Sequence, residues 1–348
     1  MMVPVLFALL AFGVEDQVVD VDFLAMNDEM RAFVDEHVTS HSDTRKLQEL
    51  VEAIFSEDFL NLVYDNTRTK TAAETFESRN GNCLSFTTMF VAMARYAGLR
   101  ANFQEVFILP TWNRKGETVV LNRHINVAVR LNGGLPHEVD FNPFRDRKEA
   151  SKRLISDQSA LAQFYNNLGA EAFATQDRKL AVRWFEKAVM TDANSSFIWS
   201  NMGVAFRYMQ DYERAEQAYL QAIRLNKREY TAMTNLSALY RLTDRPKAAE
   251  RWTKKAEHFR RQNPYYHYGK GIYAFQDGNF KDAAQHFKRA IRRKRDDHQF
   301  HFDLAKAYVM LEEVSKAEDS LARAKKFAPD VFNENRYSQK LEALAAYH

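Results

Sequence analysis

The sequence predicts an α+β domain, built of helices and an antiparallel sheet, followed by an all-α solenoid of repeated helical hairpins. Two observations carry this prediction: helical periodicity gives way to alternating, strand-like segments in the first part of the chain, and the second part repeats itself every 34 residues. The 348 residues are enough for two domains. Residues 1–161 carry six more acidic than basic side chains, and residues 162–348 nine more basic than acidic.

The chain opens with ten apolar residues, 3–12, which are too few to span a bilayer. Two interpretations of residues 1–14 stay open: a signal-peptide core that is removed on export, or a buried segment of the mature protein. We expect the first domain to occupy residues 15–145. Because the sequence has one cysteine, it excludes an intramolecular disulfide and a thiolate metal cluster.

Helices are expected within residues 28–62, on either side of the polar linker 39–43. Thr71 and Glu74 have the spacing of a capping box that starts a short helix. The cysteine, Cys83, opens a further helix that ends near Gly98. A helix N-terminus stabilises a thiolate, and its free N–H groups can bind a developing oxyanion.

Alternating apolar residues then predict strands at 101–109, 118–121, 124–131 and 137–141. The turn sequence 132–134 joins the last two strands in an antiparallel hairpin. His124 opens one of these strands, and Asp140 lies near the end of its neighbour. A cysteine on a helix with a histidine and an aspartate on adjacent strands is the nucleophile, base and orienter arrangement of acyl-transfer catalysis.

This order of residues resembles the transglutaminase-like core shared by transglutaminases, peptide N-glycanases and related cysteine peptidases. The resemblance rests on Gly81-x-Cys83, Ala94-Arg95 with Gly98–Ala101, His124, and Val139-Asp140-x-x-Pro143. The resemblance implies that Cys83 is the nucleophile, His124 the general base and acid, and Asp140 the orienter. Many family members have tryptophan two residues after the histidine, where this chain has Asn126. Gln104 and Asn82 are candidate oxyanion donors.

Two alternatives to an enzyme stay open: a buried, inert cysteine, and a folded but inactive relative that only binds. His137 competes with His124 as the base, but its place at the hairpin end ranks it lower. The other histidines lack ligand spacing with carboxylates or cysteine, so we expect no metal site and no cofactor.

Residues 162–331 form five frames of 34 residues, which begin at residues 162, 196, 230, 264 and 298. Alanine fills two columns: Ala181, Ala215, Ala249, Ala283 and Ala317, then Ala188, Ala222, Ala256, Ala290 and Ala324. Each frame holds two helices around a polar turn and resembles the tetratricopeptide repeat. We expect a linker helix at 146–161 and a capping helix at 332–348, because stacked repeats need a polar-backed end.

Such an array resembles a scaffold whose concave face binds a peptide or protein. The column expected to face the concavity contains Asn167, Asn201 and Asn235, whose amides can pair with any peptide backbone. Arg207 and Arg241 would favour an acidic ligand. The alternative is that the asparagines bond between neighbouring repeats.

Six basic residues lie within 288–295, without aromatic interleaving and directly before two aspartates. We interpret them as a solvated face and expect no nucleic-acid ligand. The predicted function is cysteine-dependent acyl transfer on an amide or peptide, with a peptide or protein partner on the repeats; the alternative is a non-enzymatic scaffold. No stable membrane span is expected. The family resemblance points to a bacterial protein and favours the cell envelope or periplasm over the cytoplasm.

Overall fold

The computed structural model describes residues 18–56, 59–108, 111–112, 119–120, 123–131, 136–141 and 149–345. The apolar segment 1–14, with its two interpretations, lies outside these residues. The chain divides into two compact units: Met1–Val106 with His124–Asp146 and Ser151–Ala232, and Phe107–Arg123 with Arg147–Ala150 and Met233–His348. No helix among the described residues combines the length and the apolar character that a membrane span requires.

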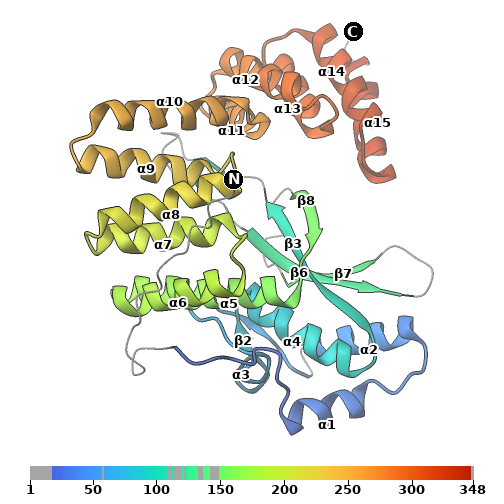
Figure 1. Ribbon diagram of the computed structural model, residues 1–348. Coiled ribbons are helices and arrows are strands. Elements are labelled where there is room, and N and C mark those ends of the chain that lie inside the picture. Colours follow the sequence, from blue (N-terminus) through green and yellow to red (C-terminus); the bar gives the residue numbers. More distant parts are fainter. Residues whose placement is uncertain are drawn as a thin grey trace, which may run out of the picture. The chain divides into compact units, whose positions relative to one another are not determined.

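The first unit begins with four helices that the sequence pattern predicted, labelled in Figure 1. They are α1 (Asp28–His37), α2 (Asp43–Phe55), α3 (Ala72–Ser78) and α4 (Cys83–Tyr96). The capping box is present at α3: the Thr71 side chain accepts from the backbone of Glu74, whose carboxylate accepts from the backbone of Thr71. Gly98 adopts a positive φ of 84° just after α4, the conformation that favours glycine at a helix end.

Helix α4 is buried on every side, because each residue from Leu84 to Ala94 is inaccessible to solvent. The apolar spacing predicted one buried face, but α1, α3 and the sheet residues all pack around this helix. Thr87 and Thr88 are therefore buried as well, and Thr87 donates to the carbonyl of Ile125. A rigid central helix with the cysteine at its first residue follows from this packing.

A four-stranded sheet in the order β7-β6-β3-β8 completes the domain. Its strands are β3 (Arg100–Ile108), β6 (Arg123–Arg130), β7 (His137–Val139) and β8 (Glu149–Leu154). Strands β6 and β7 are antiparallel, with Val127 opposite Val139. Two-residue strands form two further pairs, β1 (Val63–Tyr64) with β2 (Asn80–Gly81) and β4 (Thr111–Trp112) with β5 (Val119–Val120).

The expected linker helix at 146–161 is wrong. Residues 149–154 form the edge strand β8, and the next helix begins only at Asp157. The charged residues of β8 are matched across the sheet: Lys152 pairs with Glu138, and Arg153 with the buried Glu105. These partners are distant in sequence, so local pattern alone could not distinguish a polar edge strand from a polar helix.

The first two repeat hairpins belong to the same unit as the sheet domain. They consist of α5 (Asp157–Ala174), α6 (Arg178–Thr191), α7 (Ser196–Tyr208) and α8 (Tyr212–Leu225). The rings of Phe23 and Phe164 lie 5.9 Å apart, and the hydroxyl of Tyr165 accepts from the backbone of Val21. One hydrophobic core therefore runs from the sheet domain into the repeats.

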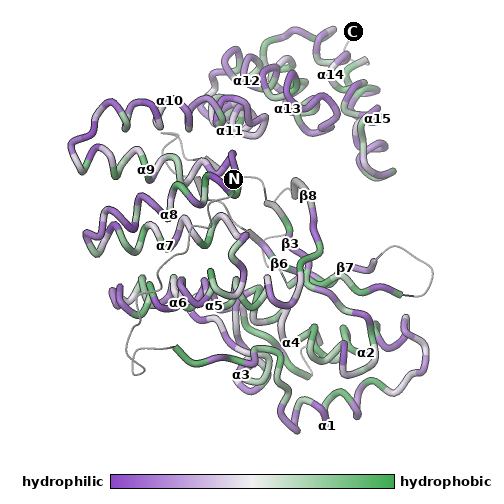
Figure 2. Tube along the Cα trace, viewed as in Figure 1, coloured by the Kyte–Doolittle hydropathy of each residue, from purple (hydrophilic) through white to green (hydrophobic). Residues whose placement is uncertain are grey.

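The second unit carries the remaining hairpins and the cap. Its helices are α9 (Tyr230–Leu242), α10 (Pro246–Gln262), α11 (Pro264–Gln276), α12 (Phe280–Arg293), α13 (His298–Val309), α14 (Val314–Lys326) and α15 (Val331–Ala345). The cap α15 packs on the last hairpin through Leu341, Leu344 and the fully buried Tyr337. Figure 2 shows that hydrophilic residues predominate along α10 and α12.

The repeats are built on one packing rule. All ten column alanines are buried, and they let the two helices of a hairpin approach closely. Position 8 of each frame, in the first helix of the hairpin, has a small residue. Where this residue is glycine, a Cβ would come within 2.7 Å of an aromatic ring: Gly169 faces Phe185, Gly203 faces Tyr219 and Gly271 faces Phe287. The third hairpin uses Ser237 and Thr253 instead, joined by a 2.6 Å hydrogen bond. The fifth uses Ala305 and Leu321.

The turn of every hairpin adopts the same backbone conformation. Position 15 of each frame has a positive φ: Gln176, Gln210, Asp244, Gly278 and Glu312. Only the fourth frame places glycine there, so the other turns adopt the left-handed conformation at some energetic cost. The polar turn sequences predicted a helix break at these positions, and the break is present in all five frames.

Candidate active site

Cys83 is the first residue of α4 and is half-buried against the core. The side chain of Asn82 caps this helix end, because its Oδ1 accepts from the backbone N–H of Ser85 at 3.0 Å. The first backbone N–H groups of a helix have no partner within it, and they carry the positive end of the helix dipole. The thiol therefore lies where a negative charge is stabilised.

Gly81 lets the strand before Cys83 approach α4 closely. It is paired with Tyr64 in the short parallel sheet, and its carbonyl accepts from the backbone of Asp65 at 2.9 Å. A Cβ at this position would come within 2.7 Å of the Cβ of Ser85. The glycine of the Gly81-x-Cys83 motif is thus required by space, two residues before the cysteine.

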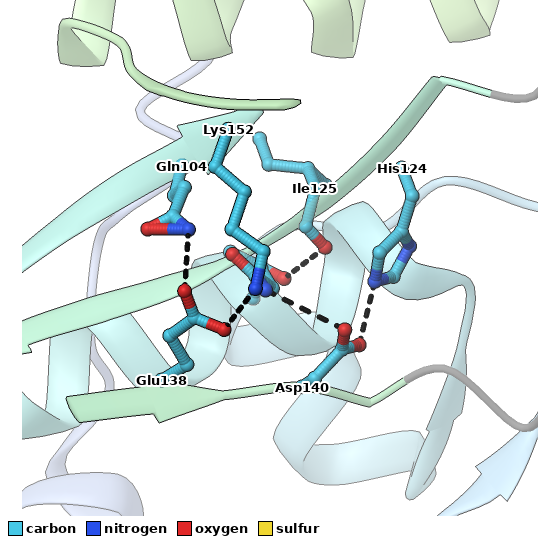
Figure 3. A network of polar contacts seen from close by, with 8 residues as sticks. Gln104, His124, Ile125, Glu138, Asp140 and Lys152 are labelled. Carbon is cyan, nitrogen blue, oxygen red and sulfur yellow. Dashed lines mark hydrogen bonds and ion pairs between the residues drawn. The ribbon is translucent and has the colours of Figure 1, made fainter. Parts of the chain in front are cut away.

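His124 lies beside Asp140. Its Nε2 is 2.5 Å from Asp140 Oδ1 (Figure 3). Burial by itself lowers the pKa of His124, which is 6% exposed. The hydrogen bonds and charges of Asp140 and Cys83 outweigh this effect and raise the pKa to about 9. The ring is therefore held in its protonated form at neutral pH.

Asp140 follows β7, on the side of the sheet to which Asn126 points. With Val127 opposite Val139, the antiparallel register puts Asn126 opposite Asp140. Nδ2 of Asn126 is 3.4 Å from Asp140 Oδ2, so the carboxylate contacts the imidazole and the amide through different oxygens (Figure 3). Sequence reasoning treated Asn126 only as a departure from tryptophan. Its position two residues after His124, on the same face of a strand, was the signal that could have placed it beside Asp140.

The two candidate oxyanion donors have other partners. Gln104 donates to Glu138 at 3.1 Å, and Glu138 also pairs with Lys152 (Figure 3). The amide of Asn82 donates to Thr69 Oγ1 at 2.8 Å. Neither side-chain amide is directed at Cys83 by these contacts, so the helix N-terminus is the remaining source of donors at the thiol.

The competing histidine, His137, is exposed and lies opposite Val129. It is therefore farther along the hairpin than the Asn126–Asp140 pair, on the side away from His124. Within the described part of the chain, no three His, Cys, Asp or Glu side chains cluster as metal ligands would.

The structure links Asn201 to the preceding hairpin, whereas Asn167 contacts its neighbour on the same helix. Asn201 donates to Asn166 at 2.9 Å, and Asn166 contacts Asn167 at 3.5 Å. These contacts favour the alternative in which the amides bond between neighbouring repeats. Asn235 is half-buried on α9, in the second unit.

The two arginines also have contacts within the chain. The Arg207 guanidinium lies 4.9 Å from the centre of the Tyr208 ring, and Arg241 donates to Ser237 Oγ at 3.2 Å. Of the basic run, Lys288, Arg289, Arg292, Arg293 and Arg295 are exposed. Lys294 instead donates to Tyr265 and pairs with Asp297. Peptide binding by the asparagines and arginines, and the absence of a nucleic-acid ligand, stay predictions.

Comparison with known families identifies both parts of the chain. Residues 31–138 match the transglutaminase-like superfamily. Three tetratricopeptide repeat models match residues 162–195, 196–228 and 268–331.

Curated relatives match over limited lengths. The human cell division cycle protein 16 homolog is 28% identical over 113 residues, which are 32% of this chain and 18% of that protein. Anaphase-promoting complex subunit 3 of Schizosaccharomyces pombe is 24% identical over 165 residues, 47% of this chain and 25% of that protein. The chain thus spans a quarter or less of these relatives.

Solved structures with similarity include MamA from Desulfovibrio magneticus, with 16% identity, a TM-score of 0.28, and coverage of 49% of this chain and 96% of that chain. The peptide-binding repeat protein YrrB has 16% identity, a TM-score of 0.27, and coverage of 51% and 92%. Because these scores are low, the fold assignment rests on the family matches. The predicted fold class and the predicted family resemblance are confirmed: the chain joins a transglutaminase-like domain to tetratricopeptide repeats.

Proposed function

We propose that the protein is a cysteine-dependent acyl-transfer enzyme that acts on an amide or peptide bond. Cys83 is the nucleophile, His124 is the general base and acid, and Asp140 orients the imidazole. The observation that carries the proposal is the position of His124, whose Nε2 lies 2.5 Å from Asp140 Oδ1 and whose pKa is raised by both Asp140 and Cys83. Nε2 is taken by the carboxylate, so Nδ1 is the ring nitrogen available to the thiol.

The proposed reaction needs only groups that this chain supplies. With His124 protonated, the proton of Cys83 already resides on the imidazole, and the thiolate adds to the substrate carbonyl carbon. Backbone N–H groups at the start of α4 stabilise the resulting oxyanion. The C–N bond then breaks while the imidazolium protonates the leaving amine, which leaves a thioester on Cys83.

A second nucleophile completes the cycle. When water attacks the thioester, His124 takes its proton, the substrate leaves as an acid, and the chain acts as a peptidase or amidase. When an amine attacks, a new amide forms and the chain acts as a transglutaminase. Both routes share the thioester, so the substrate that releases it determines the reaction class.

The repeats are proposed to bind a peptide or protein that brings the amide to Cys83. Tetratricopeptide repeats present extended surfaces, and the curated relatives include a protein named as a subunit of a larger complex. The competing function is a scaffold without catalysis. Asn126 in place of the family's tryptophan favours it, because that position lies beside the proposed orienter.

Alkylation with iodoacetamide separates the two functions, because Cys83 is the only thiol in the chain. For an enzyme we expect thiolate reactivity below neutral pH that is lost in His124→Ala. A scaffold would instead show a rate that follows an ordinary thiol, with a pKa of about 8.5, whether or not His124 is present.

A further inference from the structure

A chain of hydrogen bonds runs from the first repeat to the capped end of the cysteine helix. It starts at Glu171 on α5, whose Oε1 accepts from the backbone N–H of Thr69 at 2.6 Å. Thr69 Oγ1 in turn accepts from Asn82 Nδ2 at 2.8 Å. Oδ1 of Asn82 then accepts from the backbone N–H of Ser85 at 3.0 Å. The first bond joins residues 102 apart in sequence and the second joins residues 13 apart, and the third spans Cys83 from Asn82 to Ser85.

These bonds lie in the protein interior. Thr69 is 7% exposed, Asn82 is 9% exposed and Ser85 is fully buried. A second contact closes a loop, because Ser85 Oγ accepts from the backbone of Lys70 at 2.9 Å and donates to Asn82 Oδ1 at 3.1 Å. A buried amide whose partner is removed cannot turn to water, so each bond restricts the orientation of the next.

The acceptor at the far end of this chain is a carboxylate with several neighbours. Burial raises the pKa of Glu171, while the backbone N–H and the hydroxyl of Thr69 and the charge of Arg68 act in the opposite direction. Asp65 also faces this carboxyl group. The bond from the backbone of Thr69 to Glu171 holds the threonine, and the threonine hydroxyl oxygen accepts from Asn82.

We propose that Glu171 is a positioning residue for Cys83, acting through Thr69 and Asn82. The first repeat thereby forms part of the support of the reactive thiol. This inference rests on the proposed function and adds to it: the part of the chain that binds a partner also sets the geometry of the cysteine helix. Other residues of α5 also attach the first repeat to the sheet domain: Tyr165 bonds to Val21, and Asp157 bonds to Arg95. Glu171 is therefore not required for this attachment alone.

The test measures iodoacetamide alkylation of Cys83 between pH 5 and 9 in the full chain. In Glu171→Ala we expect the rate at pH 6.5 to fall about tenfold and the inflection of the pH profile to rise, because the helix end loses its fixed geometry. Glu171→Gln, which still accepts from Thr69, should restore most of the rate. Tyr165→Phe is the matched control: it removes another hydrogen bond between α5 and the sheet domain and should leave the profile unchanged.

Thr69→Val breaks the next bond of the chain while keeping the backbone donor to Glu171, and it should reproduce the effect of Glu171→Ala. It also serves where Glu171→Ala does not fold, as judged by thermal unfolding. The inference is overturned when Glu171→Ala or Thr69→Val reacts like the unmodified chain, or when Tyr165→Phe slows the reaction equally. The proposed function fails by a different result, namely a wild-type profile that His124→Ala does not change.

Discussion

Replacing Asp140 with asparagine tests the electrostatic arrangement of the site with the least change of shape. Asparagine keeps the size of the side chain, and its Oδ1 can still accept from Nε2–H of His124. It removes the negative charge 2.5 Å from the imidazole. Asp140 is one of the two groups that overcome the effect of burial on His124, so we expect the pKa of His124 to fall from about 9 toward 6.5.

The size of the effect follows from the fraction of thiolate. In the proposed enzyme, a protonated His124 stabilises a thiolate at Cys83. An isolated thiol with a pKa near 8.5 is only about 1% ionised at pH 6.5. Loss of the imidazolium in His124→Ala therefore lowers the alkylation rate at pH 6.5 by up to about 100-fold. Asp140→Asn, in which the imidazole remains, should lower it by about tenfold.

The same pair predicts how stability depends on pH. The folded-state pKa of His124 is raised, so its contribution is fully present below the unfolded value of 6.5 and is lost as the pH rises through about 9. A rise from 6.5 to about 9 corresponds to at most about 3 kcal/mol. The difference in unfolding free energy between the wild type and Asp140→Asn should therefore be larger at pH 6 than at pH 9.5.

Alkylation followed by mass spectrometry gives the rate, and urea unfolding at the two pH values gives the stability difference. His137→Gln is the control, because it removes an exposed histidine of the same hairpin. The reasoning is refuted by an Asp140→Asn profile that matches the wild type, or by a stability difference that grows as the pH rises.

Three further predictions concern the packing around the site and in the repeats. Gly271→Ala should destabilise α11 and α12 by about 1–3 kcal/mol, because the new Cβ would lie 2.6 Å from the buried Phe287 ring; amide hydrogen exchange in these helices should become faster. Adding Phe287→Leu should recover most of the lost stability, because the fifth hairpin packs an alanine against a leucine at the same two positions. Gly81→Ala should lower the melting temperature and slow alkylation of the thiol, and a wild-type rate would contradict the close approach. A chain that ends at residue 161 should be unfolded by circular dichroism, whereas one that ends at residue 229 should fold, because only the longer chain keeps the aromatic residues that α5 buries in the shared core.

The repeats were the part of the fold that the sequence predicted most closely. Each hairpin must solve the same packing problem, so the same small and large residues recur at fixed spacing. The alanine columns identified the helix contacts, and all ten alanines are buried. The small positions were expected to let the helices approach and the large positions to fill the gaps. The structure shows which of them touch, such as Gly169 and Phe185.

The sheet domain was predicted less completely, and the reason lies in long-range pairing. Strands β3, β6 and β7 have alternating apolar residues that mark them locally. Strand β8 has charged residues whose partners, Glu105 and Glu138, lie on other strands. Its conformation is fixed by the edge of a sheet that exists only in the folded chain, so a helix was the wrong interpretation.

The sequence named the residues proposed for the candidate site but not the residues that support them. Helix start, strand start and hairpin register were readable separately, and together they put Cys83, His124 and Asp140 near one another. The partners that hold these residues are different in kind. Asn126 required the exact cross-strand register, and the contact of Glu171 with Thr69 joins residues 102 apart in the sequence.

This difference bears on the boundary between the transglutaminase-like domain and the repeats. A boundary near residue 145 follows from sequence, because the helical period starts soon after it. In the folded chain Arg95, at the far end of the cysteine helix, donates through both terminal nitrogens to Asp157 of α5, at 2.6 and 2.8 Å. With Glu171 bonded toward the near end, α5 contacts the supports of both ends of α4. We therefore expect that displacement of α5 would change the geometry of the helix that carries the thiol.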